Sequence, residues 1–500
     1  MVEYEVRAWR SAEPRPRGRE LAWHIASLAA DPGPVAPEVA DLVADRLLDD
    51  LAVAVAALGR PAPAAARAQA LPHRMAPGAP LIGLGTAGVV SPEWAAWANG
   101  TAVRDLDMHD TYLAADYAHP GDTIPPLLAV AHHAGLSGAA LVPAVAVAYE
   151  VQMALVRGIC LHEHRIDHIA HLAPAVAAGL GTLLSLPAAT TYQAVQQALH
   201  TTTTTRQSRK GAISTWKAYA PAFAGKVAVE AVDRAMRGQT SPSPVWEGED
   251  GVIARLLGGF DARHRVMLPA PGEGCRSILD SYTKEHAAEY QAQAVIDLAR
   301  RLRPRVGDTA GVSEVVLHTS HHTHRVIGSG SGDPQKYDPA AGRETLDHSV
   351  MYIAAVALQD GEWHHERSYA PERAARPDTL ALWRRIRTVE DPDWTARYHH
   401  ADPARRAFGA RMVVAMDDGT VIEDEMAVAD AHPRGARPFD RAAYRAKWDA
   451  LAGPVLGAEE AERVAGLVAD LPALGAEDLR AVVPRAPAGA LGPAVPAGLW

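Results

Sequence analysis

Cysteine is almost absent from this chain of 500 residues. Only Cys160 and Cys275 occur, far apart in the sequence, so a disulfide framework is excluded and a reduced cytosolic setting is the default. Two thiols also cannot supply the usual ligand set of a cubane iron–sulfur cluster. The N-terminal residues 1–7 are charged from the start, which is not typical of a signal peptide. We therefore expect a cytoplasmic protein.

The sequence also lacks an excess of basic residues and any long, purely apolar run. Its net charge is −10, and without a basic stripe we expect no nucleic-acid partner. The longest apolar run, residues 141–156, contains Pro143, Glu150 and Gln152, so it is too short and too polar to span a bilayer. No Walker loop, dinucleotide fingerprint or Gly-x-Ser-x-Gly elbow is present. An anionic small molecule would need a locally basic pocket.

Aromatic residues make up only 6% of the chain, so Ala, Leu and Val must form the core, which favours packed helices. Apolar spacing predicts helices at residues 38–49, 225–236, 284–302 and 440–451. Alternation predicts strands at 313–319, 411–416 and 421–428, the last two joined by a turn at Asp417-Asp418-Gly419. The predicted fold is mainly α with an α+β part. Its expected divisions are a helical domain at 1–273, an α+β domain at 274–432, a helical return at 433–483 and a flexible tail at 484–500.

Residues 107–122 carry four carboxylates and two imidazoles but no Lys or Arg. Carboxylates packed together shift one another's pKa values. Such a stretch is typical of a metal site, a pocket for a cation or a centre of proton transfer, although a plain acidic loop gives the same pattern.

A basic window follows at residues 201–217, where five threonines precede Arg206, Arg209, Lys210 and Lys217. Hydroxyls and cations together suit a polycarboxylate, because charge-assisted hydrogen bonds to carboxylates are strong and directional. The alternative is a solvated loop between helices.

Two histidine strings are further candidates. His164, His168 and His171 fall on one face if the segment is helical, a spacing that zinc could use. His318, His321, His322 and His324 follow a predicted strand, whose alternation sends His321 to the opposite side from the others. Single imidazoles that bind an anion or move a proton are the alternative to a metal.

These strings together resemble the MmgE/PrpD family. The acidic stretch with Asp107, Thr111 and His119-Pro120 resembles the family signature, and the match continues in order along the chain. It includes residues 203–211, 216–221, 247–252, 281–286, 321–324, 343–348, 356–361 and 368–373. The resemblance implies a helical domain, a smaller α+β lid domain and a homodimer. It also implies dehydration of a tricarboxylate, 2-methylcitrate, in propionate catabolism, with citrate or cis-aconitate as further substrates and no metal or other cofactor.

The resemblance also assigns site residues. It implies catalytic roles for Asp107, Thr111, His119, His171, Lys217 and Lys284, and we expect substrate binding by Arg206, Arg209, Lys210, His321 and His322. We hypothesise that His119 and His171 divide the proton transfers while Asp107 orients or charge-tunes one of them.

Other activities stay open at this point. Relatives with the same fold decarboxylate cis-aconitate or epimerise iminodisuccinate. The decarboxylase branch has a lid histidine where this chain has Glu289, which disfavours decarboxylation and leaves the catalytic partner on the lid undefined. Alternatives from other classes are a metal-dependent hydrolase that uses the Asp/His stretch and a non-catalytic helical scaffold.

Overall fold

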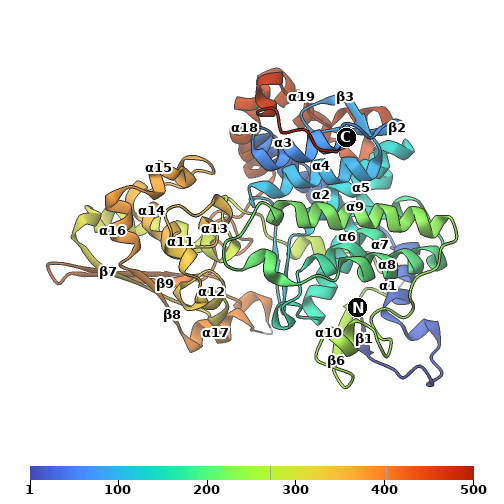
Figure 1. Cartoon of the computed structure of the whole chain (residues 1–500), viewed down its shortest axis with the longest axis horizontal. Coiled ribbons are helices and arrows are strands. Elements are labelled where there is room, and N and C mark those ends of the chain that lie inside the picture. The colour runs from blue at the N-terminus through green and yellow to red at the C-terminus, as the bar shows by residue number, and fades with distance from the viewer. Residues whose placement is uncertain (271, 401, 500) are drawn as a thin grey trace.

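The computed structural model describes residues 1–270, 272–400 and 402–499. Its first part is a bundle of helices, on the right in Figure 1. The helices are α1 (Leu21–Ala30), α2 (Pro37–Ala57), α3 (Pro61–Ala70), α4 (Pro92–Asp105), α5 (Ile124–Ala134), α6 (Gly138–Gly158), α7 (Ile169–Leu183), α8 (Ala188–Thr202), α9 (Trp216–Met236) and α10 (Val252–Leu256). Three short antiparallel pairs accompany them: β1 (Val2–Arg7) with β6 (Arg263–Leu268), β2 (Arg74–Leu81) with β3 (Gly85–Val90), and β4 (Tyr112–Leu113) with β5 (Tyr117–Ala118).

Small residues let these helices approach closely. Helix α7 lies at the centre of the bundle and contacts α6, α8 and α9. A Cβ atom at Gly179 would lie 2.8 Å from the carbonyl oxygen of Ala144 on α6, and one at Gly181 would lie 2.5 Å from the hydroxyl of Thr191 on α8. The Ala- and Gly-rich composition is therefore a packing requirement, as the low aromatic content suggested.

The second part is α+β and lies on the left in Figure 1. Its strands β7 (Val312–Thr319), β8 (Ile386–Glu390), β9 (Ala410–Met416) and β10 (Val421–Met426) form one sheet in the order β10-β9-β7-β8, with only the β7–β8 pair parallel. Helices α11 (Tyr290–Val306) and α14 (Val350–Asp360) share a hydrophobic core with this sheet. The shorter helices are α12 (His321–Val326), α13 (Arg343–Leu346), α15 (Pro371–Ala374), α16 (Pro377–Trp383) and α17 (Pro392–Tyr398). The hairpin predicted at residues 411–428 is confirmed by the β9–β10 pair.

The chain then returns to the helical bundle. Helices α18 (Arg441–Leu456), α19 (Ala458–Ala469) and α20 (Ala476–Ala481) follow, and α18 packs along α2, at the top of Figure 1. Beyond them, Gly83 exchanges backbone hydrogen bonds with Pro484 (2.9 Å) and Ala486 (3.0 Å). Trp500, the end of the expected tail, lies outside the described residues.

Three local predictions were wrong. Helix α11 begins at Tyr290, not at Lys284, because the Glu289 side chain caps it by accepting a hydrogen bond from the Gln291 amide. Residues 321–326 form a helix capped by Ser320, so strand alternation does not apply to the histidines there. Helix α7 begins at Ile169, so His164, His168 and His171 do not share one helical face.

Among the described helices, α6 alone has the length and apolarity needed to cross a membrane. Of its most apolar window, 83% is buried inside the protein, which is the pattern of a core helix.

Candidate active site

The acidic stretch forms a loop between α4 and α5 that folds back on itself. Thr111 exchanges backbone hydrogen bonds with Tyr282 (2.8 and 2.9 Å), which ties the loop to the segment just before Lys284. The β4–β5 pair then reverses the chain, and the Nδ1 atom of His119 lies 2.9 Å from the carbonyl oxygen of Asp110. The loop therefore brings Asp107 and His119 close to the segment that leads to Lys284.

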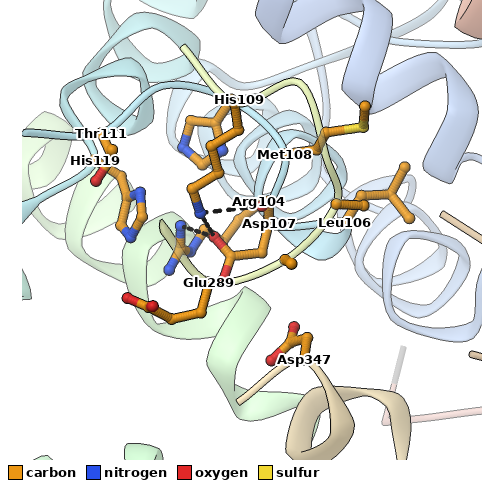
Figure 2. A network of polar contacts seen from close by, with 12 residues as sticks. Arg104, Leu106, Asp107, Met108, His109, Thr111, His119, Glu289 and Asp347 are labelled. Carbon is orange, nitrogen blue, oxygen red and sulfur yellow. Dashed lines mark hydrogen bonds and ion pairs between the residues drawn. The ribbon is translucent and has the colours of Figure 1, made fainter. Parts of the chain in front are cut away.

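Asp107 is the centre of a buried charge cluster. Its Oδ1 atom lies 3.0 Å from Arg104 Nη1 and 2.5 Å from Lys284 Nζ, and its Oδ2 atom lies 2.8 Å from Lys217 Nζ. Figure 2 shows Arg104 and Asp107 within this network. Burial opposes ionisation, but the three cations outweigh it and hold the pKa of Asp107 well below its usual range. Asp107 is therefore a fixed anion that positions two lysines.

The cluster continues into the α+β part. Lys217 Nζ also lies 2.5 Å from Asp347 Oδ2, and the other oxygen of Asp347 contacts Nδ1 of His348. Lys217, with His348 also contributing, keeps the pKa of Asp347 below its usual value despite burial. Asp347 thus joins the two parts of the chain at the site.

A cavity lies against this cluster, and both parts of the chain form its walls. The side chains that line it are mostly charged or imidazole groups. They are Arg104, Asp107, Thr111, Leu113, Tyr117, His119, His168, Arg206 and Arg209 from the helical part, and Glu289, His322, Val326 and His348 from the α+β part. About 20 Å³ is open to the centres of water molecules, which is room for about one water.

Two histidines that line the cavity have one ring nitrogen in a hydrogen bond: Nδ1 of His119 with the Asp110 carbonyl, and Nδ1 of His348 with Asp347. Nδ1 of His168 lies 3.2 Å from an Asp167 carboxylate oxygen but makes no hydrogen bond within the described residues. Because a carbonyl or carboxylate oxygen only accepts, Nδ1 of His119 and of His348 carries the hydrogen and Nε2 keeps its lone pair. In these positions neutral imidazoles are proton acceptors.

The pKa values of these histidines agree with the neutral form. Burial, with the charges of Arg104 and Lys284, holds the pKa of His119 well below its usual value. Burial also lowers the pKa of His168, with Asp167 opposing, and lowers that of His348 to about 4.

The cavity also contains unsatisfied cationic donors. Nε and Nη2 of Arg209 make no hydrogen bond within the described part of the chain, although Nε lies 3.5 Å from an Asp167 oxygen. Arg206 lies beside it and donates from Nε to the Tyr117 hydroxyl (3.2 Å). Buried guanidinium donors without partners are suited to a carboxylate ligand.

The structure places some predicted residues elsewhere. His171 does not line the cavity: its Nε2 lies 3.0 Å from the Ile159 carbonyl, behind the wall. Lys210 is exposed and pairs with Asp333 at 3.0 Å. His321 packs on the ring of His399 at 5.1 Å, also outside the lining. Lys217 and Lys284 contact Asp107 from behind the lining.

The other predicted residues lie at the cavity, and sequence reasoning missed several. Asp107, Thr111, His119, Arg206, Arg209 and His322 all line it. The missed residues are Arg104, Tyr117 and His348, and His168 was a candidate only as a member of the histidine string at 164–171. The Asp167-His168 and Asp347-His348 pairs were available as a signal, since a carboxylate next to an imidazole fixes its tautomer. No hydrogen bond from Asp107 to a histidine occurs among the described residues, so it does not orient one directly.

Among the described residues, one group has the geometry of metal ligands: Glu285, His286 and Asp297. Arg437 lies 3.0 Å from Glu285, and Arg300 lies 3.7 Å from Asp297. These cations already neutralise the carboxylates, so the group is explained as an ion-pair network.

The structure thus combines a mainly helical part, an α+β part and a cation-rich cavity that both parts line. Residues 19–265 match the MmgE/PrpD N-terminal domain and residues 286–472 match the MmgE/PrpD C-terminal domain. The chain belongs to the MmgE/PrpD family, which confirms the resemblance in the sequence.

Several curated relatives share one name. The chain is 26% identical to the 2-methylcitrate dehydratase of Cupriavidus necator over 77% of this chain and 80% of that protein. It is 27% identical to the 2-methylcitrate dehydratase of Escherichia coli K12 over 76% and 78%. It is 26% identical to a probable 2-methylcitrate dehydratase of Saccharomyces cerevisiae over 68% of each chain.

Proposed function

We propose that this protein is a 2-methylcitrate dehydratase that eliminates water from 2-methylcitrate to give 2-methyl-cis-aconitate, in propionate catabolism. The observation that carries the proposal is the cavity itself, where unpartnered arginine donors and proton-accepting histidines lie together. A tricarboxylate that loses a proton and a hydroxide needs both. The names of the relatives support the same activity.

The cations that the helical part contributes to the cavity, here called the helical wall, bind the substrate in this proposal. Arg104, Arg206 and Arg209 line the cavity, and their guanidinium groups can bind carboxylates through paired hydrogen bonds. Lys217 and Lys284 lie one layer behind, held by Asp107. Their positive charge stabilises the negative charge that develops on a carboxylate as the neighbouring carbon loses its proton.

The base in this proposal is His119. Its Nδ1 is engaged with the Asp110 carbonyl, so Nε2 is free to take the proton from the methyl-bearing carbon. In place of His171, this proposal gives the shared proton transfer to His168, which lines the cavity and lies 3.2 Å from an Asp167 carboxylate oxygen.

The α+β part acts as a lid in this proposal. The cavity has room for about one water, far less than a tricarboxylate requires, so the two parts must move apart to admit substrate.

We also infer that the protein is a homodimer and that it lies in the cytoplasm. Sedimentation of the purified protein would test the first inference, and cell fractionation would test the second.

The test is the ultraviolet absorbance of the conjugated product, followed with purified protein, 2-methylcitrate and a chelator. A rise that persists with chelator is expected. No rise, with release of carbon dioxide from cis-aconitate, would move the chain to the decarboxylase activity. A rise that the chelator abolishes would require a metal. Citrate tested in parallel measures the selectivity for the methyl group.

His119→Asn tests the base within the same assay. Losing a positioned base lowers kcat by roughly 10²- to 10⁴-fold. His171→Asn is the matched control, since His171 is buried nearby but does not line the cavity. Equal losses in both variants would remove His119 from the proton transfer.

A further inference from the structure

Elimination needs an acid as well as a base, and the histidines supply only acceptors. His119 and His348 each use Nδ1 for an internal hydrogen bond and present Nε2. Burial lowers the pKa of the other two histidines in the lining, His168 and His322, so these are neutral as well and have no acidic proton to give. The Tyr117 hydroxyl accepts from Arg206, and burial raises the pKa of this phenol, so it is a poor proton donor. The proton for the leaving hydroxyl must come from another group.

Glu289 is the carboxyl group that the α+β part places in the cavity. It lies at the N-terminus of α11, where one side-chain oxygen accepts a hydrogen bond from the Gln291 amide at 2.8 Å. Its own backbone amide donates to the Asp347 carbonyl at 3.3 Å. Figure 2 shows its carboxyl group and the His119 ring on the same side of Asp107. Glu289 is therefore held in place both by its carboxyl group and by its backbone amide.

The side-chain amide of Gln291 faces the same carboxyl group. With its nitrogen turned toward Glu289, this amide donates to the carboxyl oxygens. A carboxyl group can accept such a hydrogen bond in either protonation state, so the contact holds Glu289 in place.

The charges around Glu289 leave the acid form populated. Burial raises its pKa to about 7, and Asp107 adds to this effect. Lys284 in the preceding loop, the amide of Gln291 on α11 and Lys217 on α9 oppose it. Tyr398 on α17 is neutral, because its pKa lies well above its usual value. Near neutral pH, a substantial fraction of Glu289 therefore carries a proton.

We propose that Glu289 is the general acid that protonates the departing hydroxyl group. The inference rests on the proposed function. His119 Nε2 takes the proton from the methyl-bearing carbon, and the electron pair of that C–H bond forms the new double bond. The C–O bond to the adjacent carbon breaks, and the oxygen takes the Glu289 proton and leaves as water. Glu289 ends as a carboxylate near Lys284, and exchange with solvent restores both protonation states.

Glu289→Gln tests the proposal, because it keeps the size of the side chain and removes the acidic proton. We expect kcat to fall by roughly 10²- to 10⁴-fold, with substrate affinity by calorimetry nearly unchanged. Glu285→Gln is the matched control. Glu285 lies four residues earlier, pairs with Arg437 and does not line the cavity, so its variant should turn over normally.

A second substrate separates an acid from a structural residue. With fluorine in place of the hydroxyl, the leaving group needs little protonation, so Glu289→Gln should eliminate fluoride at nearly the rate of the unchanged protein. An equal loss with both substrates would overturn the proposal, as would normal dehydration by Glu289→Gln. If the unchanged protein dehydrates no 2-methylcitrate, the proposed function fails instead.

The pH profile gives an independent readout. The acid form of Glu289 is the active one, so kcat/KM of the unchanged protein should fall as the pH rises through about 7, since kcat/KM follows the ionisation of the free enzyme. On the acid side, kcat/KM should fall only well below the usual histidine range, where His119 becomes protonated. Glu289→Gln should retain the acid limb and lose the alkaline limb. An alkaline limb that survives the substitution belongs to another group and overturns the assignment.

Discussion

The two walls of the cavity differ in their electrostatics. The helical wall contributes Arg104, Arg206 and Arg209, which stay charged at all working pH values. The α+β wall contributes Glu289, His322 and His348, and burial favours the neutral form of each. The difference separates two tasks: the helical wall carries the cations that hold an anion together with the proposed base His119, and the α+β wall brings the neutral carboxyl group of Glu289. Neither wall alone contains both the proposed base and a carboxyl group that can give up a proton.

Polar contacts join the helical wall to the α+β wall. Lys217 pairs with Asp347 at 2.5 Å, and Lys210 pairs with Asp333 at 3.0 Å. Arg343 donates to the carbonyl oxygens of Asp105 and Leu106 at 3.1 and 3.0 Å. Because these contacts connect the two walls, the proposed lid closure would form them and complete the site in one event.

The largest effect is expected at the fixed anion between the walls. Asp107→Asn removes the negative charge from Arg104, Lys217 and Lys284, which then repel one another. Leaving buried charges unpaired costs roughly 3–5 kcal/mol, and mispositioned lysines should lower kcat/KM by roughly 10³-fold. Chemical denaturation and steady-state kinetics measure the two effects.

Asp105→Asn is the control for Asp107. It lies two residues away, is buried and pairs with the half-buried Arg60, but it does not line the cavity. Its loss removes one partner of a buried pair and should cost up to about 3–5 kcal/mol of stability, while kcat/KM stays near that of the unchanged protein. Wild-type kinetics in Asp107→Asn would show that the cluster is structural and that the walls do not depend on it.

Sequence patterns predicted those site residues and turns that depend only on neighbouring residues. Asp107, Thr111 and His119 stand in one short stretch, and the Asp-Asp-Gly turn was sufficient for the β9–β10 hairpin. Patterns failed where a cap changed the local structure. The Ser320 cap made a helix from a predicted strand end, and the Glu289 cap shifted the start of α11 past Lys284.

The remaining site residues depend on tertiary structure. His348 is more than two hundred residues from His119 in the sequence, and only the packing of the two parts brings both to one cavity. His168 and His171 are close in sequence, but the start of α7 at Ile169 decides which one reaches the cavity. Sequence spacing alone could not make that choice.

A smaller effect is expected from the helical wall alone. Arg209→Gln removes a guanidinium whose Nε and Nη2 have no hydrogen-bond partner among the described residues. A lost hydrogen bond to a charged group costs roughly 1.5–3 kcal/mol, so KM should rise by roughly 10- to 100-fold with a smaller change in kcat. Initial rates over a range of 2-methylcitrate concentrations measure both constants.

Lys210→Gln sharpens the result for Arg209. Lys210 is adjacent and basic, but it is exposed and pairs with Asp333 outside the cavity, so KM should change by less than about twofold. If Lys210→Gln raised KM as much as Arg209→Gln, general attraction of the anion would explain both, and the helical wall would have no specific carboxylate site.

The smallest effect concerns the apolar residues in the two walls. Leu113 and Val326 are the aliphatic side chains that line the cavity, one from each wall. Val326 lies four residues after His322 on α12, so both face the same way. Leu113 lies two residues after Thr111, and alternation along an extended segment sends both to one side. The methyl group of 2-methylcitrate therefore has an apolar surface beside the polar groups.

Val326→Ala should weaken selectivity for the methyl group while leaving the polar chemistry in place. One methyl group contributes roughly 1–3 kcal/mol of discrimination, and only part of its contact is lost, so the ratio of kcat/KM for 2-methylcitrate over citrate should fall by roughly fivefold. Competition between the two substrates measures the ratio directly. Val389→Ala, a half-buried position on β8 outside the cavity, should leave the ratio unchanged. An equal loss for both substrates in Val326→Ala would place Val326 in lid closure and leave the methyl group without a partner on the α+β wall.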